Sequence, residues 1–426
     1  MAWGAIWRLT MAKPGLFILG GSTYYTLLLF QAMKDVALDQ HLGRITLFAR
    51  NESRLRTLVS CGTELFAGSL RVDYSLQLED CLSSEYALIF NQMRFGGLKS
   101  RDQDEKIALD VGLFADETLG IVGASNAVRT ITALKPFLEL IQQKQGSYQF
   151  INFTNPCSIV TEYIKRHFAI PVVGICDYPQ MMRHSIAHYY GVAVADVDAR
   201  YFGINHFGYL YDVKVKGEDK LAELCRTPLP FKPDVNRYFN NLLNISWHYL
   251  FEQDTAVQQQ RQKANRASQL LDIEAELDQC VERHGPNLDK VMAILHRREC
   301  HWFELVVAPL LRALVTGLPH QEYLNLVCES PLSLGEPTVI EANASIHSGC
   351  LVVDDLPIRL VKDPEFMWVQ QMKLAETRML RAILARDFDG VVTACLINPL
   401  IANKNKIIKY FACLNQVDEA FNTIFN

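Results

Sequence analysis

The chain has 426 residues, of which 49% are hydrophobic and 21% are charged, and its formal net charge is −5 at pH 7. This length favours two domains, or one domain with a large elaboration, and the composition is typical of a soluble globular protein. A mildly acidic chain argues against nucleic-acid binding, and no apolar run reaches the roughly 20 residues that span a bilayer.

The first half of the chain alternates short apolar runs with helical patterns. Strands are predicted in "PGLFIL", "GRITLFARN", "EYALIFNQM", "YQFINFTNP" and "PVVGICDYP". Strands that alternate with helices predict a parallel, doubly wound sheet, and near-continuous apolar strands indicate that helices cover both faces. The predicted fold class is therefore α/β, with a Rossmann-type parallel sheet over residues 13–198.

Beyond this point the pattern changes. The segment "DARYFGINHFGYLYDVKVKGEDK" predicts an antiparallel ribbon, and residues 232–300 are predicted to be mostly polar helix. An apolar helix that ends at Gly317, a β stretch in "TVIEANASIHSGCLVVDD" and a helix pair that turns near Asp387–Gly390 follow. Residues 199–426 are thus predicted to form a second, α+β domain whose C-terminal helices pack back on the first.

The turn after the first strand, "LGGSTYYT", lies where a Rossmann sheet binds the pyrophosphate of a dinucleotide. Backbone N–H groups of Gly20, Gly21 and Ser22 would then face the phosphates. The fingerprint is incomplete because Leu19 replaces its first glycine, so a plain structural turn is the alternative. The acid that usually binds the ribose hydroxyls is absent, and Arg50 nearby is either a surface charge or a group for the 2′-phosphate of NADP.

Polar residues follow three of the predicted strands: Asn152 and Asn155, then Cys176 and Asp177, then Asn205 and His206. Ligands collect at the carboxyl ends of parallel strands. A thiolate and an imidazole are ligands for first-row metals, and such a pair leaves positions open for substrate oxygens. Two ligands are a weak signal by spacing alone, so ordinary buried side chains are the alternative.

Several segments, taken together, resemble glycoside hydrolase family 4. They are "GGST", "MRFGG", "DEKIALDVGLFADETLG", "TNPCSIVTEYI", "GICDYP", "YFGINHFGY" and "CLINPL", in the family's order over about residues 16–400. The resemblance implies a lactate/malate-dehydrogenase-like Rossmann domain that carries a sugar-binding domain. It also implies glycoside hydrolysis with NAD and a divalent metal, usually Mn²⁺, outside the two-carboxylate scheme of other glycosidases.

The implied reaction begins with hydride transfer from C3 of the sugar to NAD. A base then removes the C2 proton, which the neighbouring carbonyl and the metal make acidic, and the glycosidic oxygen leaves with help from an acid. Water addition and return of the hydride complete the hydrolysis.

The resemblance assigns Cys176 and His206 to the metal and Asp177 to the general acid. An Asp after this Cys is typical of the phospho-α-glucosidase branch, whereas the β branch has Asn. Asn155 is expected to contact the sugar near the nicotinamide, and Asn205 beside His206 is a further substrate contact.

At the other end of the sugar, Arg94 is expected near a 6-phosphate, where a guanidinium group can make two hydrogen bonds. Glu117 is expected near the site without a chemical step.

The chain departs from the family pattern at the base. The α branch has a Tyr where an ungapped match places Ile245, which cannot accept a proton. Tyr249, one helical turn on, is the replacement that we expect, with Tyr238 as another, although Tyr249 could equally be a packed aromatic. The segment "LVCESPLSLGEP" lacks the family's Asn-Asn-Gly loop, which leaves the 6-phosphate requirement open.

Two functions of different classes follow. The first is an NAD- and Mn²⁺-dependent hydrolase of a 6-phospho-α-glucoside, with NADP as another cofactor. The second is a catalytically weakened relative that binds a sugar ligand or has a regulatory role. Retention of Cys176, Asp177, Asn155 and His206 favours the first. A simple hydroxyacid dehydrogenase is disfavoured, because such enzymes use no metal.

The expected partner is a small phosphoglycoside, with neither nucleic acid nor membrane. The 11 cysteines lack the spacing of a disulfide framework, which indicates reduced thiols in the cytoplasm. Residues 1–12 are predicted to be a short arm rather than a secretory signal. The apolar helices 301–317 and 365–384, with the family habit, suggest a homodimer or homotetramer.

Overall fold

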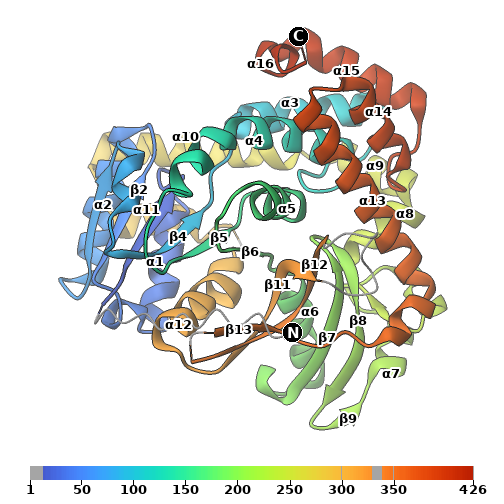
Figure 1. The fold of residues 1–426 in the computed structure, drawn as a ribbon, viewed down its shortest axis with the longest axis horizontal. Coiled ribbons are helices and arrows are strands. Elements are labelled where there is room, and N and C mark those ends of the chain that lie inside the picture. The colour runs from blue at the N-terminus through green and yellow to red at the C-terminus, as the bar shows by residue number, and fades with distance from the viewer. Residues whose placement is uncertain (1–12, 299, 329–337, 349, 426) are drawn as a thin grey trace.

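The computed structural model describes residues 13–298, 300–328, 338–348 and 350–425 (Figure 1). The arm expected over residues 1–12 lies outside the described residues. So does most of the segment that lacks the Asn-Asn-Gly loop.

A parallel half-sheet forms the first part of the molecule, as predicted. Its strands are β1 (Gly15–Leu19), β2 (Arg44–Phe48), β3 (Arg71–Ser75), β4 (Tyr86–Asn91), β5 (Gln149–Asn152) and β6 (Val172–Ile175). Their spatial order is β3-β2-β1-β4-β5-β6, all parallel, which is the order of a Rossmann sheet. The α/β fold class is confirmed, although β3 was missed because its residues are only partly buried and carry two charges.

Helices cover both faces of this half-sheet. They are α1 (Thr26–Asp35) and α2 (Glu52–Phe66) on one face and α4 (Gly120–Ile141) and α5 (Cys157–His167) on the other. Helix α3 (Gly97–Asp110) packs on α4, and α6 (Tyr178–Tyr190) packs on β7 and β11 of the other half. Residues of β1 alternate between the two cores: Leu16 and Ile18 pack with α1 and α2, while Phe17 and Leu19 pack with α4 and α5. All four side chains are fully buried, which explains the continuous apolar run.

The sheet continues without a break into an antiparallel half. Next to β6 come β11 (His320–Cys328), β12 (Thr338–His347), β7 (Val197–Ile204), β8 (Phe207–Val215) and β10 (Leu242–Leu243), with β13 (Cys350–Val353) beside β12 and β9 (Glu218–Asp219) beside β8. The predicted ribbon is the β7–β8 hairpin, and the predicted β stretch is β12 with β13, whereas β11 was missed. The domain boundary at residue 198 stays a prediction.

The remaining helices surround the antiparallel half and reach back over the parallel one. They are α7 (Leu221–Arg226), α8 (His248–Phe251), α9 (Gln253–Arg261), α10 (Arg266–His284), α11 (Leu288–Leu295), α12 (Ala308–Thr316), α13 (Pro364–Ala385), α14 (Phe388–Ile397), α15 (Lys404–Val417) and α16 (Glu419–Thr423). Among the described residues, no helix is both long and apolar enough to cross a membrane.

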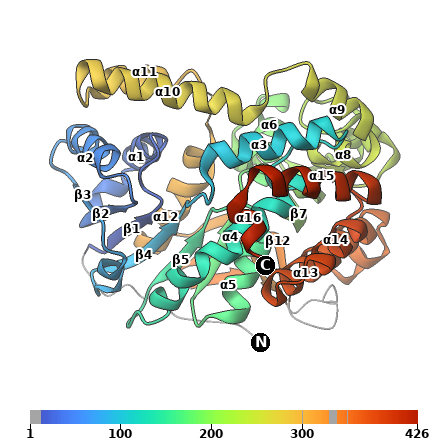
Figure 2. The ribbon, with the colours of Figure 1, turned by 90° about the horizontal axis from the view of Figure 1, so that it is seen from above.

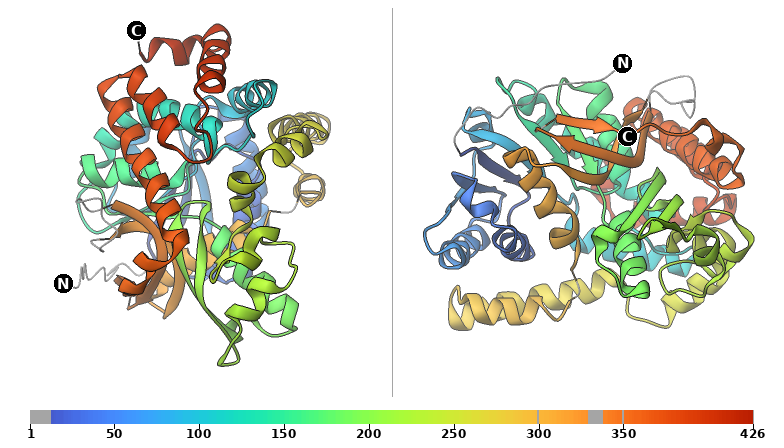
Figure 3. Two further views of the ribbon diagram at one scale, coloured as in Figure 1. Left: turned by 90° about the vertical axis from the view of Figure 1, so that its right-hand side faces the viewer. Right: turned by 90° about the horizontal axis from the view of Figure 1, so that it is seen from below.

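Two of these helical segments tie the halves together. The long α10–α11 segment lies along α1 and α2 (Figure 2), where Arg54 forms ion pairs with Glu274 and Asp278. Helix α13 packs against α4, α5 and β7 (Figure 3), and its Lys373 forms a buried ion pair with Glu162 of α5.

The predicted helix ends are also confirmed. Gly317, with φ of 70°, ends α12, and Asp387 caps α14 by accepting a hydrogen bond from the Gly390 N–H.

Candidate active site

The sheet brings together the residues that the sequence placed at separate strand ends. Cys176 directly follows β6, and His206 lies in the tip of the β7–β8 hairpin, with β11 and β12 between these strands. One ligand atom each from Cys176, Asp177 and His206 lies within 4.8 Å of the others. This is the predicted constellation of a thiol, a carboxyl and an imidazole.

The hairpin turn holds His206 in an unusual backbone conformation. Ile204 pairs with Phe207, so Asn205 and His206 form a two-residue turn, and His206 has φ of 66°. Glycine is the usual residue with positive φ in such a turn. Asn205 points back toward α5, where its side-chain oxygen accepts the Cys157 N–H at 3.2 Å.

Burial dominates the electrostatics of the cluster. It raises the pKa of the Cys176 thiol well above its ordinary value, and the carboxyl groups of Glu341 and Asp177 add to this effect. Burial also raises the pKa of Asp177, although nearby His206 opposes the shift. A carboxyl group with a raised pKa can keep a proton for donation to a substrate.

The cluster fits a divalent metal. The Nδ1 atom of His206 is buried with no hydrogen-bond partner in the described part of the chain, which is costly unless a ligand satisfies it. Thiolate, imidazole and carboxylate together can ligate first-row divalent ions. A bound cation would also deprotonate the buried Cys176 thiol.

Glu117 connects the sugar-binding candidates. It forms ion pairs with Arg94 and, at 2.9 Å, with Arg101, and it accepts a hydrogen bond from Asn155 Nδ2 at 3.4 Å. Burial disfavours the ionised carboxyl, but the two guanidinium groups outweigh burial and hold the pKa of Glu117 below its ordinary value. The structure thus gathers Arg94 and Asn155 around Glu117, while nearby His206 also affects its pKa.

The Gly-rich turn lies against β2. The N–H groups of Gly20 and Gly21 both donate to the Phe48 carbonyl at 3.0 Å. Among the described residues, the Ser22 N–H has no partner and is available to a phosphate oxygen. Arg50 is exposed just beyond the end of β2.

The three residues considered for the base differ in their surroundings. Ile245 begins a short 3₁₀ turn, and Tyr238 is 73% exposed. Tyr249 on α8 stacks on Phe114 with ring centroids 4.1 Å apart, and its hydroxyl accepts a hydrogen bond from Gln260 at 3.4 Å. Burial raises the pKa of Tyr249 well above its ordinary value.

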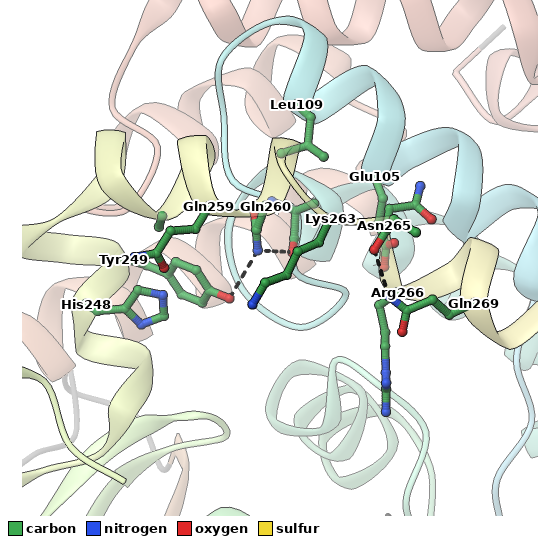
Figure 4. Close-up of a pocket in the computed structure, with 13 residues that line it drawn as sticks. Glu105, Leu109, His248, Tyr249, Gln259, Gln260, Lys263, Asn265, Arg266 and Gln269 are labelled. Atoms are coloured by element: carbon green, nitrogen blue, oxygen red, sulfur yellow. Dashed lines mark hydrogen bonds between the residues drawn. The ribbon is translucent and has the colours of Figure 1, made fainter. Parts of the chain in front are cut away.

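Tyr249 also lines a cavity of about 330 Å³ between α3, α8, α9 and the start of α10. Its hydroxyl points toward Gln260 and Lys263, while the Arg266 side chain points away from them (Figure 4).

Sequence reasoning missed several residues near the cluster. The ring of Tyr178 packs edge-on against His206, with centroids 4.3 Å apart. Its position next to Asp177 in the sequence could have marked it as a site residue.

Glu341 and Asn325, also near the cluster, are buried and joined by a 2.7 Å hydrogen bond. Burial raises the pKa of Glu341 to about 8. No sequence signal marked this pair, because only the pairing of β11 with β12 brings the two residues opposite each other.

Curated relatives include enzymes that act on phosphorylated glucosides. The 6-phospho-beta-glucosidase BglT of Thermotoga maritima is 29% identical over 221 residues, which are 51% of this chain and 53% of the relative. The phospho-alpha-glucosidase PagL of Clostridium acetobutylicum is 29% identical over 236 residues, 51% and 52% of the two chains. The chain therefore matches about half the length of these relatives.

Solved structures share the whole fold. The 6-phospho-beta glucosidase from Thermotoga maritima, solved with manganese, NAD⁺ and glucose-6-phosphate, matches with a TM-score of 0.82 and 21% identity over 96% of this chain and 99% of that one. A lactate dehydrogenase from Eimeria maxima matches with a TM-score of 0.55 and 11% identity over 89% and 97%. The lactate/malate-dehydrogenase-like sheet is thus confirmed.

Family models match both halves of the chain. The model described as family 4 glycosyl hydrolase matches residues 16–192, and the model of its C-terminal domain matches residues 201–401. Together they cover most of the sequence. The chain belongs to family 4 of the glycosyl hydrolases.

Proposed function

We propose that this protein hydrolyses a phosphorylated glycoside with the help of NAD and a divalent metal, Mn²⁺ in the first instance. The observation that carries the proposal is the cluster of Cys176, Asp177 and His206 at the end of β6 and the tip of β7–β8. Family membership and the phosphoglucosidase relatives support the same chemistry.

The metal and the dinucleotide are proposed to bind at two separate groups of residues. Cys176 and His206 would bind the metal. The turn of Gly20, Gly21 and Ser22 would face the pyrophosphate through the Ser22 N–H, because the other two N–H groups donate to the Phe48 carbonyl, and Arg50 would lie beside the ribose. NAD would supply a hydride acceptor for the sugar, and the metal would supply a Lewis acid next to it. If Arg50 contacts a 2′-phosphate, NADP replaces NAD.

Asp177 is proposed as the acid that protonates the departing glycosidic oxygen. Its carboxyl group lies beside Cys176, with Sγ and Oδ1 3.8 Å apart. Burial raises its pKa, which favours the protonated form that an acid needs. An Asp at this position supports an α-glycoside as the substrate.

Tyr249 is proposed as the base that removes the C2 proton, in place of Ile245. Its hydroxyl accepts one hydrogen bond from Gln260 and points toward Lys263. Burial raises the pKa of this hydroxyl, so the phenolate, which is the form that accepts a proton, would form only with a cation beside it.

A 6-phosphate on the sugar is proposed from the arginine residues near the site. Arg94 is joined to Glu117, and Asn155 and Asn205 are proposed to contact sugar hydroxyls. Burial lowers the pKa of Arg266, and the nearby guanidinium groups of Arg298 and Arg101 lower it further. Among the described residues, no carboxylate forms an ion pair with Arg266, so an anionic substrate would relieve this repulsion.

The proposal is tested by the hydrolysis of p-nitrophenyl glucosides under reducing conditions. We expect turnover of the α-glucoside 6-phosphate with NAD and Mn²⁺, less with the β anomer, and none without either cofactor. The unphosphorylated α-glucoside is the control for the phosphate. No turnover of any of these compounds, with sugar phosphate still bound in calorimetry, would favour the alternative of a catalytically weakened sugar-binding relative.

The assembly and location are proposals as well. The family habit supports a homodimer or homotetramer, which light scattering would measure. The apolar helices 301–317 and 365–384 do not add to this, because most of their apolar side chains are buried within the chain itself. The free cysteines support a cytoplasmic location.

A further inference from the structure

Asn244 lies buried behind the metal cluster, and the proposed chemistry does not use it. Its side-chain Nδ2 donates hydrogen bonds to the His206 carbonyl at 3.1 Å and to the Tyr201 hydroxyl at 3.2 Å. Its Oδ1 accepts the Ser246 N–H at 3.0 Å. Both ends of the amide are therefore engaged, and its orientation is fixed.

The bond to His206 meets a specific need of the hairpin turn. His206 has φ of 66°, a conformation that residues other than glycine seldom adopt. Such a conformation persists only where the surrounding structure enforces it. A buried donor on the carbonyl of this same residue restrains the peptide group that follows the strained φ.

The segment around Asn244 is itself fastened to the hairpin. The Gly208 carbonyl on β8 accepts both the Asn244 backbone N–H at 3.1 Å and the Trp247 indole N–H at 2.9 Å. The rings of Trp247 and Phe207 stack with centroids 4.2 Å apart. Asn244 is thus held in register with the turn that it restrains.

The turn is restrained from the other side as well. Asn205 accepts the backbone N–H of Cys157 at the start of α5. Between these two anchors, the buried Nδ1 of His206 is left without a partner among the described residues. The backbone is therefore fixed by hydrogen bonds, while this ring nitrogen stays available to a ligand.

We infer that Asn244 is a positioning residue for the metal centre: it holds the His206 backbone so that the imidazole reaches the cation beside Cys176. The inference rests on the proposed metal site, and it concerns a residue outside the proposed ligand set. Partners that orient metal ligands commonly contribute 10- to 100-fold to metal affinity.

The test compares Mn²⁺ binding by the metal-free protein and its variants, measured by electron paramagnetic resonance under reducing conditions. For Asn244→Ala we expect Mn²⁺ binding to be weaker by about 10-fold or more.

Asn236→Ala is the matched control. Asn236 is also buried in this segment and also bonds two backbone groups, the Asn241 carbonyl and the Leu243 N–H, both at 2.8 Å. We expect Asn236→Ala to lower the melting temperature but to keep the Mn²⁺ affinity.

A second variant separates hydrogen bonding from general stability and from charge. Asn244→Asp keeps the acceptor for the Ser246 N–H but removes the donor to the His206 carbonyl. If charge alone mattered, an added carboxylate would strengthen cation binding, whereas our inference expects Asn244→Asp to bind Mn²⁺ more weakly than wild type.

The inference is overturned if both Asn244 variants bind Mn²⁺ as tightly as wild type, or if Asn236→Ala weakens binding as much as Asn244→Ala. A wild-type protein that binds no Mn²⁺ would overturn the metal centre and this role together. Tight wild-type binding with unaffected Asn244 variants would overturn only the role of Asn244 and leave the proposed function in place.

Discussion

At the residue scale, the chemistry depends on side chains whose environment differs strongly from water. Cys176 is 2% exposed, and its thiol is disfavoured as a thiolate unless a cation replaces the lost hydration. One ligand atom each of Asp177 and His206 lies within 4.8 Å of this thiol. If these side chains were exposed, water would solvate the thiolate and the carboxylate, and a metal would be less needed to stabilise their charges.

Cys176→Ser is predicted to weaken Mn²⁺ binding, because a serine hydroxyl is a poorer ligand and does not ionise near neutral pH. We expect affinity to fall by at least about 10-fold, measured by calorimetry with Mn²⁺. Cys61→Ser is a suitable control, since Cys61 is equally buried but lies on α2, away from the cluster. Unchanged Mn²⁺ affinity in Cys176→Ser would remove this residue from the ligand set.

Asp177→Asn is predicted to distinguish an acid from a metal ligand. Loss of a general acid should slow hydrolysis of an alkyl glycoside by about 10²- to 10⁴-fold. A p-nitrophenyl leaving group needs little protonation, so its hydrolysis should be slowed far less. Equal losses with both aglycones, together with weaker Mn²⁺ binding, would instead identify Asp177 as a ligand.

At the element scale, the turn after β1 depends on a glycine for two reasons. Gly20 has φ of 81°, and a Cβ atom there would lie 2.8 Å from the backbone of Met93. The turn therefore lies directly against the residues that follow β4, beside the expected pyrophosphate site. The incomplete fingerprint around Leu19 therefore still contains the glycine that the backbone requires.

Gly20→Ala is predicted to lower the free energy of unfolding by about 2–4 kcal/mol, since it combines a strained φ with overpacking. Gly68→Ala is the matched control, because Gly68 has a similar φ of 88° but a Cβ atom there would meet no described atom within 4 Å. We expect that change to cost only about 1 kcal/mol. Urea unfolding of both variants measures the difference, and equal losses would show that the contact with Met93 has no effect.

At the scale of the whole molecule, buried ion pairs fasten the C-terminal helices to the Rossmann half. Lys373 on α13 and Glu162 on α5 are 2.5 Å apart, with side chains only 4% and 2% exposed. Burial disfavours both charges, but each is outweighed by its partners. Consequently the pKa of Glu162 is lowered and that of Lys373 is raised.

Lys373→Met is predicted to destabilise the fold by roughly 3 kcal/mol at pH 7, because it leaves the buried Glu162 charge with Arg166 as its remaining ion-pair partner. The lowered pKa of Glu162 contributes stability above its ordinary value of 4.5, and this contribution is lost as pH falls through the folded pKa. The gap between variant and wild type should therefore shrink in acid. Urea unfolding at pH 7 and pH 4 checks this, and Lys373→Met with Glu162→Gln should recover part of the loss.

Much of the fold was predictable because local patterns agree with it. Buried parallel strands such as β1 and β6 leave continuous apolar runs, and the helix end at Gly317 has its own backbone signature. The strands β3 and β11 were missed for a physical reason. Charged or polar residues interrupt both strands, so neither leaves the continuous apolar run that marks β1 and β6.

The sequence by itself determined which residue types follow the strand ends, so a site of Cys176, Asp177 and His206 was predicted before any contact was known, and these three side chains do lie together. Only the tertiary structure decided what surrounds them. The Asn244 bond to the His206 carbonyl and the buried Glu341 depend on strands and turns that are distant along the chain. Periodicity and spacing report local backbone geometry, whereas burial and long-range hydrogen bonds arise only when the sheet is assembled.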